Sequence, residues 1–192
     1  GVPTFYDKYD GNWRNSLSLK NGNAGLGTTN PGYKLDVQGT IRATGDFIKA
    51  AKTTAALNTA GWYRIAQSPD RGGDNAGIFE IRWTVNRRHG HVRFAIGANY
   101  GDDGGAQITI LDQSSHGGKI IEKIRLLMKG TNDRHFVEFY FNGSIHRNNA
   151  VPFTIYQLSG YGWSLVEPVA GSMPDGYSSY ELRANVLFAT RS

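Results

Sequence analysis

Apolar and polar residues alternate along much of this chain, and a period of two predicts β-strands with one buried face. In residues 79–85 every second residue is large and apolar, and the residues between them are polar. In residues 92–98 apolar side chains again fall on alternate positions, at Val92, Phe94, Ile96 and Ala98. Because the turn sequence Arg87-Arg88-His89-Gly90 separates the two runs, they predict a β-hairpin.

Further strand patterns fill the rest of residues 61–192. Residues 120–129 fit a helix face as well as a strand, and the strand is favoured because a hairpin loop and a clear strand at 136–141 follow. The regular alternation over 180–188 predicts a last strand in the centre of a sheet. Other expected strands span 62–66, 107–111, 152–158 and 162–166. About nine strands separated by frequent turns predict a β-sandwich of jelly-roll or lectin-like type.

The N-terminal part has a different pattern, with short strands interrupted by glycine every few residues. Leu35, Val37, Ile41 and Ala43 fall on alternate positions and predict one apolar edge. Strands this short cannot enclose a core within one chain. Three copies wound around an axis would bury these edges and pair the open strand edges, so the segment predicts a trimer.

The segment GLGTTNPGYKLDVQGTIRA, from Gly25 to Ala43, resembles the repeat in the distal shafts of tail fibres of phages and of phage-like contractile injection systems. The stretch that carries the resemblance, Ala24 to Gly45, has about 22 residues, and the resemblance does not extend to residues 60–192. It implies an interwoven trimeric β-shaft near a fibre tip, followed by a receptor-binding head or by a chaperone that is cut away. The expected trimer contacts are Leu26, Leu35, Val37 and Ile41.

Together these patterns predict an all-β chain in three parts: a short interwoven trimeric β-shaft over 1–45, a neck over 46–60, and a β-sandwich receptor-binding head over 61–192. The neck sequence is ambiguous, because its alanines favour a short helix and its threonines favour extended chain. Trp62 and Trp83 lie in strand patterns and are expected in the core of the head.

Composition narrows the possible chemistry. The 192 residues include 25 glycines, 12% aromatic residues and no cysteine, which suits a turn-rich β-protein and excludes disulfides and thiol chemistry. The formal net charge of +5 favours contact with anionic surfaces such as lipopolysaccharide phosphate or acidic capsule. The basic residues are scattered and form no basic helix, so nucleic acid is not an expected partner. No apolar run approaches the ~20 residues of a membrane span.

Metal sites have weak support in the sequence. His89 and His91 share one face of an extended strand or hairpin turn, and three copies on a trimer axis would offer six nitrogens to a metal. The arginines beside them oppose a cation, so a polar hairpin tip is favoured. Asp102 and Asp103, or the loop residues 68–76, could ligate Ca²⁺, but the spacing of a dedicated calcium loop is missing. No other cofactor is expected.

Glycan recognition needs an aromatic face for the sugar ring and planar polar groups for its hydroxyls. Several predicted loops combine both kinds of residue. The candidate ligand-binding residues are Tyr100, Asp102, Asp103, His146, Arg147, Asn148, Tyr161, Trp163 and Tyr177.

Catalysis is not expected. The glutamates stand singly, and no nucleophile elbow, zinc-protease helix or phosphate-binding loop occurs. The sequence therefore predicts a homotrimeric fibre-tip protein on a virion or other extracellular particle, which binds a glycan or a surface protein of its target cell. It would attach there to upstream fibre or baseplate proteins. Two alternatives stay open, a structural trimerisation module without ligand and a polysaccharide-degrading fibre enzyme.

Overall fold

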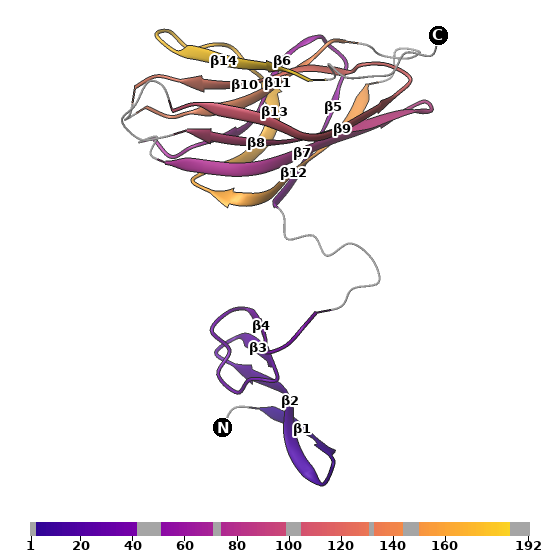
Figure 1. The fold of residues 1–192 in the computed structure, drawn as a ribbon, viewed down its shortest axis with the longest axis vertical. Coiled ribbons are helices and arrows are strands. Elements are labelled where there is room, and N and C mark those ends of the chain that lie inside the picture. Colours follow the sequence, from indigo (N-terminus) through magenta and orange to yellow (C-terminus); the bar gives the residue numbers. More distant parts are fainter. Residues whose placement is uncertain are drawn as a thin grey trace. The chain divides into compact units, whose positions relative to one another are not determined.

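The computed structural model describes residues 3–41, 51–70, 74–98, 105–130, 133–143 and 150–184. These residues form fourteen strands and no helix, which confirms the expected all-β class (Figure 1). The chain divides into two compact units, Gly1–Phe47 and Ile48–Ser192. Each unit is described by itself below.

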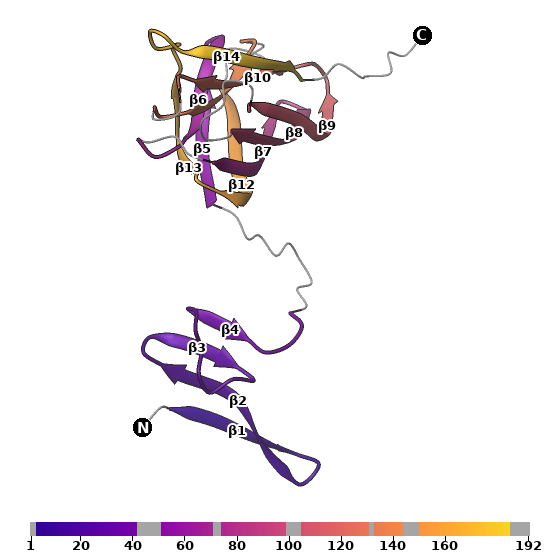
Figure 2. The ribbon, with the colours of Figure 1, turned by 60° about the vertical axis from the view of Figure 1, so that its left-hand side comes forward.

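The first unit contains one four-stranded sheet in sequence order (Figure 2). Its strands are β1 (Thr4–Tyr9), β2 (Asn12–Lys20), β3 (Asn23–Leu26) and β4 (Leu35–Val37). The pairing is antiparallel except for β3 with β4, which is parallel. Asp10-Gly11 and Asn21-Gly22 close the two hairpins with positive φ at both residues, the turn geometry that matches the strand twist.

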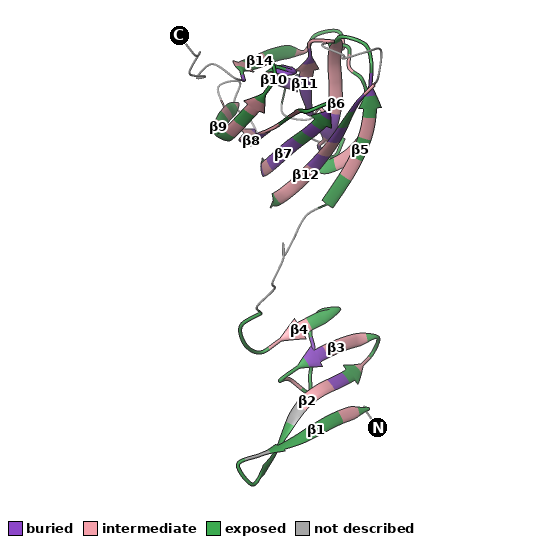
Figure 3. Cartoon of the chain, turned by 90° about the vertical axis from the view of Figure 1, so that its right-hand side faces the viewer, coloured by how far each residue is buried: buried purple, intermediate pink, exposed green. Residues whose placement is uncertain are grey.

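The first unit has almost no interior of its own. Among its described residues only Ser18, Gly25 and Pro31 are buried, whereas Trp13 is 70% and Tyr33 75% exposed (Figure 3). Six further large apolar residues are exposed: Phe5, Tyr6, Leu19, Leu26, Leu35 and Ile41. A sheet that exposes this many large apolar side chains to water lacks the buried apolar area that stabilises a domain.

The second unit contains two five-stranded antiparallel sheets. The first sheet has the order β13-β6-β11-β10-β14 and the second the order β5-β12-β7-β8-β9. The strand bounds are β5 (Ala51–Leu57), β6 (Gly61–Gln67), β7 (Asn75–Val85), β8 (Arg88–Ala98), β9 (Gln107–His116), β10 (Ile121–Met128), β11 (Phe136–Phe141), β12 (Val151–Tyr161), β13 (Ser164–Ala170) and β14 (Ser178–Arg183).

The two sheets share one apolar core in a sandwich-like arrangement. Phe153 of β12 contacts Phe139 and Phe141 of β11, with ring centroids 5.2 Å and 5.4 Å apart. Trp83 is buried in this core, as expected. Trp62 is not a core residue: it is half-buried and lies under the guanidinium of Arg125, with which it makes a cation–π contact.

Three elements differ from the expectation. Strand β5 lies inside the range 46–60 expected as a neck, and it belongs to the second unit because it pairs with β12 along seven residues. The predicted hairpin forms, but Asn86 and Arg87 make its turn with positive φ, so the turn comes before Gly90. Strand β14 lies at the edge of its sheet rather than in the centre, because it pairs only with β10.

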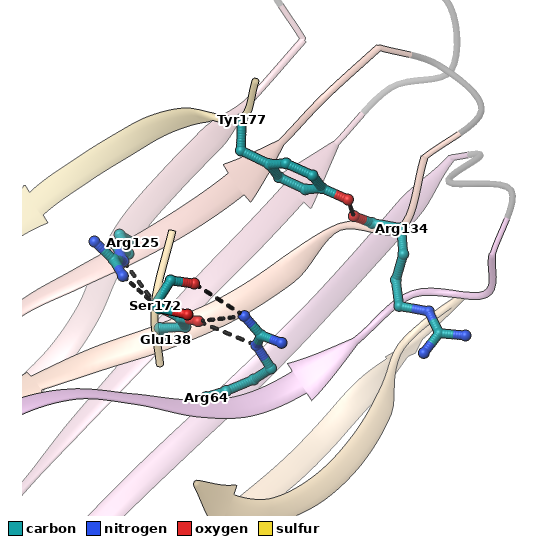
Figure 4. A network of polar contacts seen from close by, with 6 residues as sticks. All are labelled: Arg64, Arg125, Arg134, Glu138, Ser172 and Tyr177. Atoms are coloured by element: carbon teal, nitrogen blue, oxygen red, sulfur yellow. Dashed lines mark hydrogen bonds and ion pairs between the residues drawn. The ribbon is translucent and has the colours of Figure 1, made fainter. Parts of the chain in front are cut away.

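A segment of the same chain lies against part of the outer face of the first sheet. Residues 171–177, here called the crossing segment, join β13 and β14, which lie at opposite edges of that sheet. The carbonyl of Ser172 accepts a hydrogen bond from Arg64 of β6, and the ring of Tyr177 lies 5.7 Å from that of Phe136 of β11. Gly171 donates a backbone hydrogen bond to Trp62. The Tyr177 hydroxyl donates to the carbonyl of Arg134 (Figure 4).

A charged cluster lies under this segment. The fully buried carboxylate of Glu138 accepts hydrogen bonds from Arg125 at 2.6 Å and from Arg64 at 3.1 Å (Figure 4). Each guanidinium also covers an aromatic ring, Arg125 on Trp62 and Arg64 on Phe136. A Cβ on Gly171 would lie 2.6 Å from the carboxylate, so glycine is needed where the crossing segment passes over it.

Replacing Glu138 tests this cluster. Glu138→Gln leaves two guanidinium groups without their buried counter-charge. We expect it to lower the free energy of unfolding by about 3–5 kcal/mol, because removing one partner of a buried ion pair leaves the other charge buried and uncompensated. Urea denaturation measures the loss. The matched control is Glu181→Gln, which breaks the exposed pair with Lys123 and should cost only about 0.2–1 kcal/mol. Equal losses in both variants would contradict a stabilising role for the buried cluster.

Candidate functional site

The second sheet carries a grid of polar side chains on its outer face. Every second residue of β7 and β8 points into the core. The residues between them therefore point to the outer face of the sheet. The pairing register aligns these outer residues in rows across the strands. Glu80, Arg93 and Asp112 form one row, Arg82, His91 and Ser114 the next, and Thr84, His89 and His116 the third.

This grid surrounds a surface hollow of about 450 Å³, here called the polar hollow. Outer residues from all three rows line it, and the core residue Trp83 lines it as well. Gly90, opposite Trp83 in the register, makes this possible, because a Cβ there would collide with the indole ring and with the carbonyl of Ser114. The Nε1–H of Trp83 is buried and has no hydrogen-bond partner in the described part of the chain.

His91 links two of the rows. Its Nε2 lies 2.9 Å from Oδ2 of Asp112, and its Nδ1 lies 2.9 Å from the hydroxyl of Ser114. Because a carboxylate can only accept, we assign the proton to Nε2; Nδ1 then accepts from Ser114. The hydrogen bond from His91 lowers the pKa of Asp112 below its usual value of 3.8, outweighing its slight desolvation.

Two further contacts hold the grid in place. Glu80 accepts a hydrogen bond from Nε of Arg82, whose guanidinium also lies 5.1 Å from the ring of Tyr156 on β12. His89 and His116 stack with ring centroids 5.2 Å apart. Interlocked side chains of this kind are pre-ordered, so a ligand that binds them loses less conformational entropy.

The hydrogen-bonded chain from Ser114 through His91 to Asp112 contains the three residue types of the Ser-His-Asp triad of hydrolases. In that triad the carboxylate is buried, and it orients the histidine and stabilises the positive charge that forms on it. The side chain of Asp112 is 65% exposed, so water competes for it. The arrangement is therefore better suited to binding hydroxyl groups than to activating a serine.

The described residues of one chain bring together no set of side chains for the metal considered at His89 and His91, and Asp102 and Asp103 lie outside the described residues. His89 and His91 do share one face of β8, but among the described residues no three His, Asp or Glu side chains are placed to hold a metal ion. His91 uses both ring nitrogens in hydrogen bonds.

A second hollow of about 330 Å³ adjoins the first on the same outer face. Small or apolar residues line most of it, among them Ala76, Ile78, Ala95 and Gly97. Ile78 and Ala95 pair across β7 and β8 one row beyond Glu80 and Arg93. This apolar hollow therefore continues the polar hollow along the strands.

The structure describes three of the residues expected to bind ligand. Tyr161 is 65% exposed at the end of β12, whereas Trp163 is buried and contacts Phe79 of the core. The hydroxyl of Tyr177 bonds to Arg134, and burial raises the pKa of that phenol. The remaining candidates lie outside the described residues: Tyr100, Asp102, Asp103, His146, Arg147 and Asn148.

The loop after β6 uses its polar groups internally. Asp70 pairs with Arg134, and the buried Asn75 lies 3.4 Å from Nδ1 of the fully buried His135. Ser68 accepts the backbone N–H of His135 at 2.8 Å. Burial lowers the pKa of His135 below 6.5, although a bond to Gly130 and the charge of Asp133 oppose the shift.

Sequence reasoning missed most of the polar hollow. It singled out His89 and His91 for metal but not Asp112, Ser114, Glu80 or Arg82. The available signal was the alternation itself, since the polar members of the predicted hairpin must share the face opposite the core. The partners on β9 depend on the register between β8 and β9, which contains a bulge.

Comparison of the sequence with protein-family models, with curated proteins and with solved structures finds no match. The described residues include no helix with the length and apolar character that a membrane crossing requires.

The pKa of Asp112 tests the His91 contact. His91→Ala removes the hydrogen bond that holds the carboxylate ionised, so the pKa of Asp112 should rise toward 3.8. Carbon-detected NMR titration of the carboxyl group measures it. His116→Ala is the control, because His116 stacks on His89 instead, and the pKa of Asp112 should keep its value. An unchanged pKa in His91→Ala would refute the contact.

His135 should make stability depend on pH. Its pKa is lower in the folded than in the unfolded state, so the unfolded chain binds the proton first as the pH falls. The stability that neutral His135 contributes is complete above pH ~6.5 and declines below it, by up to about 1.4 kcal/mol per pH unit. Urea unfolding between pH 7.5 and 5 should show a smaller decline for His135→Gln. The exposed His116→Gln should behave like the parent protein; if His135→Gln does so too, the buried histidine is not the cause.

Proposed function

We propose that this protein is a homotrimeric fibre tip that attaches a phage or phage-like particle to its target cell by binding a surface glycan. The observation that carries the proposal is the first unit, whose large apolar side chains are exposed in the single chain. Three of the four expected trimer contacts, Leu26, Leu35 and Ile41, are among them, and Val37 is half-buried. We propose that two other copies of the chain bury these apolar side chains in the trimer.

The backbone of the shaft-like segment supports the resemblance to tail fibres. Gly27 has a φ of 75°, and a Cβ on Gly25 would collide with the carbonyl of Thr28. Pro31 is buried, and the carbonyl of Pro31 accepts from Asn23. The local fold therefore needs glycine at positions 25 and 27, two of the positions that the repeat specifies.

The second unit supports a receptor-binding role. It presents a pre-ordered polar hollow, and three copies on one particle would bind a surface polysaccharide with much higher avidity than one. A surface protein of the cell is the second choice of receptor. The proposed location is the tail fibre of a virion or the surface of an extracellular particle, where upstream fibre or baseplate proteins hold the chain.

Two alternatives make different predictions. A structural connector without ligand would leave particle adsorption unchanged when the surface of the second unit is altered. A polysaccharide-degrading enzyme would release reducing ends from purified surface polysaccharide.

The mass of the native particle tests the trimer. Light scattering should give about three times 21.1 kDa. The double variant Leu35→Asp with Ile41→Asp places charges on the proposed contact surface, and we expect it to give a single-chain mass. Val169→Asp is the control, because Val169 is comparably exposed (52%) but lies in the second unit. A monomeric parent protein would overturn the fibre proposal.

A further inference from the structure

The outer face of the second sheet is hollowed at the surface. On the first sheet the crossing segment lies against the Glu138 cluster, and Glu138 is fully buried. On the second sheet the corresponding outer residues His89, Arg93, Asp112 and Ser114 are exposed. Two adjoining hollows of about 450 Å³ and 330 Å³ lie there.

The charges of the polar hollow cancel. Among its lining residues, Arg82 and Arg93 carry two positive charges, and Glu80 and Asp112 carry two negative charges, so the sum is zero with histidine neutral. A highly charged ligand, such as a nucleic acid or a phosphate-rich surface, gains little from such a lining. A neutral ligand with many hydroxyl groups can use both kinds of charge, because each hydroxyl donates to a carboxylate and accepts from a guanidinium.

The neighbouring apolar hollow supplies the other half of the chemistry. Sugar rings have polar edges and apolar C–H faces, so a saccharide needs hydrogen-bonding groups beside a small-residue or aromatic surface. Ala95 and Gly97 continue the β8 positions of His91 and Arg93 toward the apolar hollow. A chain of sugar units along β8 would place hydroxyls over one hollow and a ring face over the other.

We propose that the two hollows together form one binding groove for a neutral oligosaccharide. Asp112 and Glu80 accept hydrogen bonds from its hydroxyls, Arg82 and Arg93 donate to them, and the outer side chain of Ala95 packs against a ring face. The Ser114–His91–Asp112 hydrogen bonds keep the carboxylate in position. This inference rests on the proposed glycan receptor and names the site and the class of sugar.

Binding to defined glycans tests the groove. The native assembly is applied to an array of neutral hexose, N-acetylhexosamine and uronic-acid oligosaccharides, and the best ligand is titrated by calorimetry. We expect a neutral oligosaccharide to bind, Asp112→Asn to weaken binding at least tenfold, and Ala95→Arg to abolish it by filling the groove. Glu181→Gln, an exposed carboxylate of the other sheet, is the control and should bind like the parent protein. Circular dichroism verifies that each variant is folded.

Accessibility provides an independent test, because the chain has no cysteine of its own. Ser114→Cys introduces a single thiol in the polar hollow, and in the native assembly a maleimide should modify it at the rate of a free thiol. The oligosaccharide should slow this reaction. A thiol that is protected without sugar would mean that a second copy covers the groove, which overturns the proposal.

The outcomes separate the groove from the general function. If the parent protein binds a glycan and both Asp112→Asn and Ala95→Arg bind equally well, the groove is wrong while the glycan receptor stands. Binding of uronic-acid oligosaccharides alone would refute the neutral class. If no array glycan binds, the groove proposal falls, and adsorption of the parent protein to target cells then decides between a protein receptor and a connector.

Discussion

The second unit depends on one apolar layer between its two sheets. Phe153 of β12 meets Phe139 and Phe141 of β11 there, and every strand turns its alternate apolar residues toward this layer. Because a strand has only two faces, using one for the core assigns all its remaining side chains to the other. The character of each outer face is therefore a consequence of the packing inside.

The outer faces of the two sheets differ in how their charged side chains are paired and exposed. On the first sheet the crossing segment lies over the Glu138 cluster, where the Glu138 carboxylate pairs with both Arg64 and Arg125 and Gly171 leaves room for it. On the second sheet Glu80 is buried and pairs with Arg82, whereas Asp112 is exposed and pairs with His91. These exposed polar atoms are the ones on which the proposed binding groove depends.

The first unit lacks the layer that organises the second. Its turns are well formed and its strands pair in order, yet Trp13, Tyr33 and Leu35 remain exposed. Backbone pairing by itself contributes too little to hold a small sheet in water. A chain with one self-sufficient unit and one dependent unit fits the proposal that assembly completes the fold, and that the complete unit displays the binding surface.

Local patterns in the sequence determined the strands and the class of fold. The alternation in 79–85 and 92–98 predicted β7 and β8, because this signal acts between neighbouring residues. Tertiary structure decided what depends on distant pairing. Ala51–Leu57 pairs with β12 in a sheet, and β14 lies at the edge of its sheet. Asp112 and Ser114 of β9 lie beside His91. Strand order and register follow from how two whole sheets bury their apolar faces together, and no single segment carries that information.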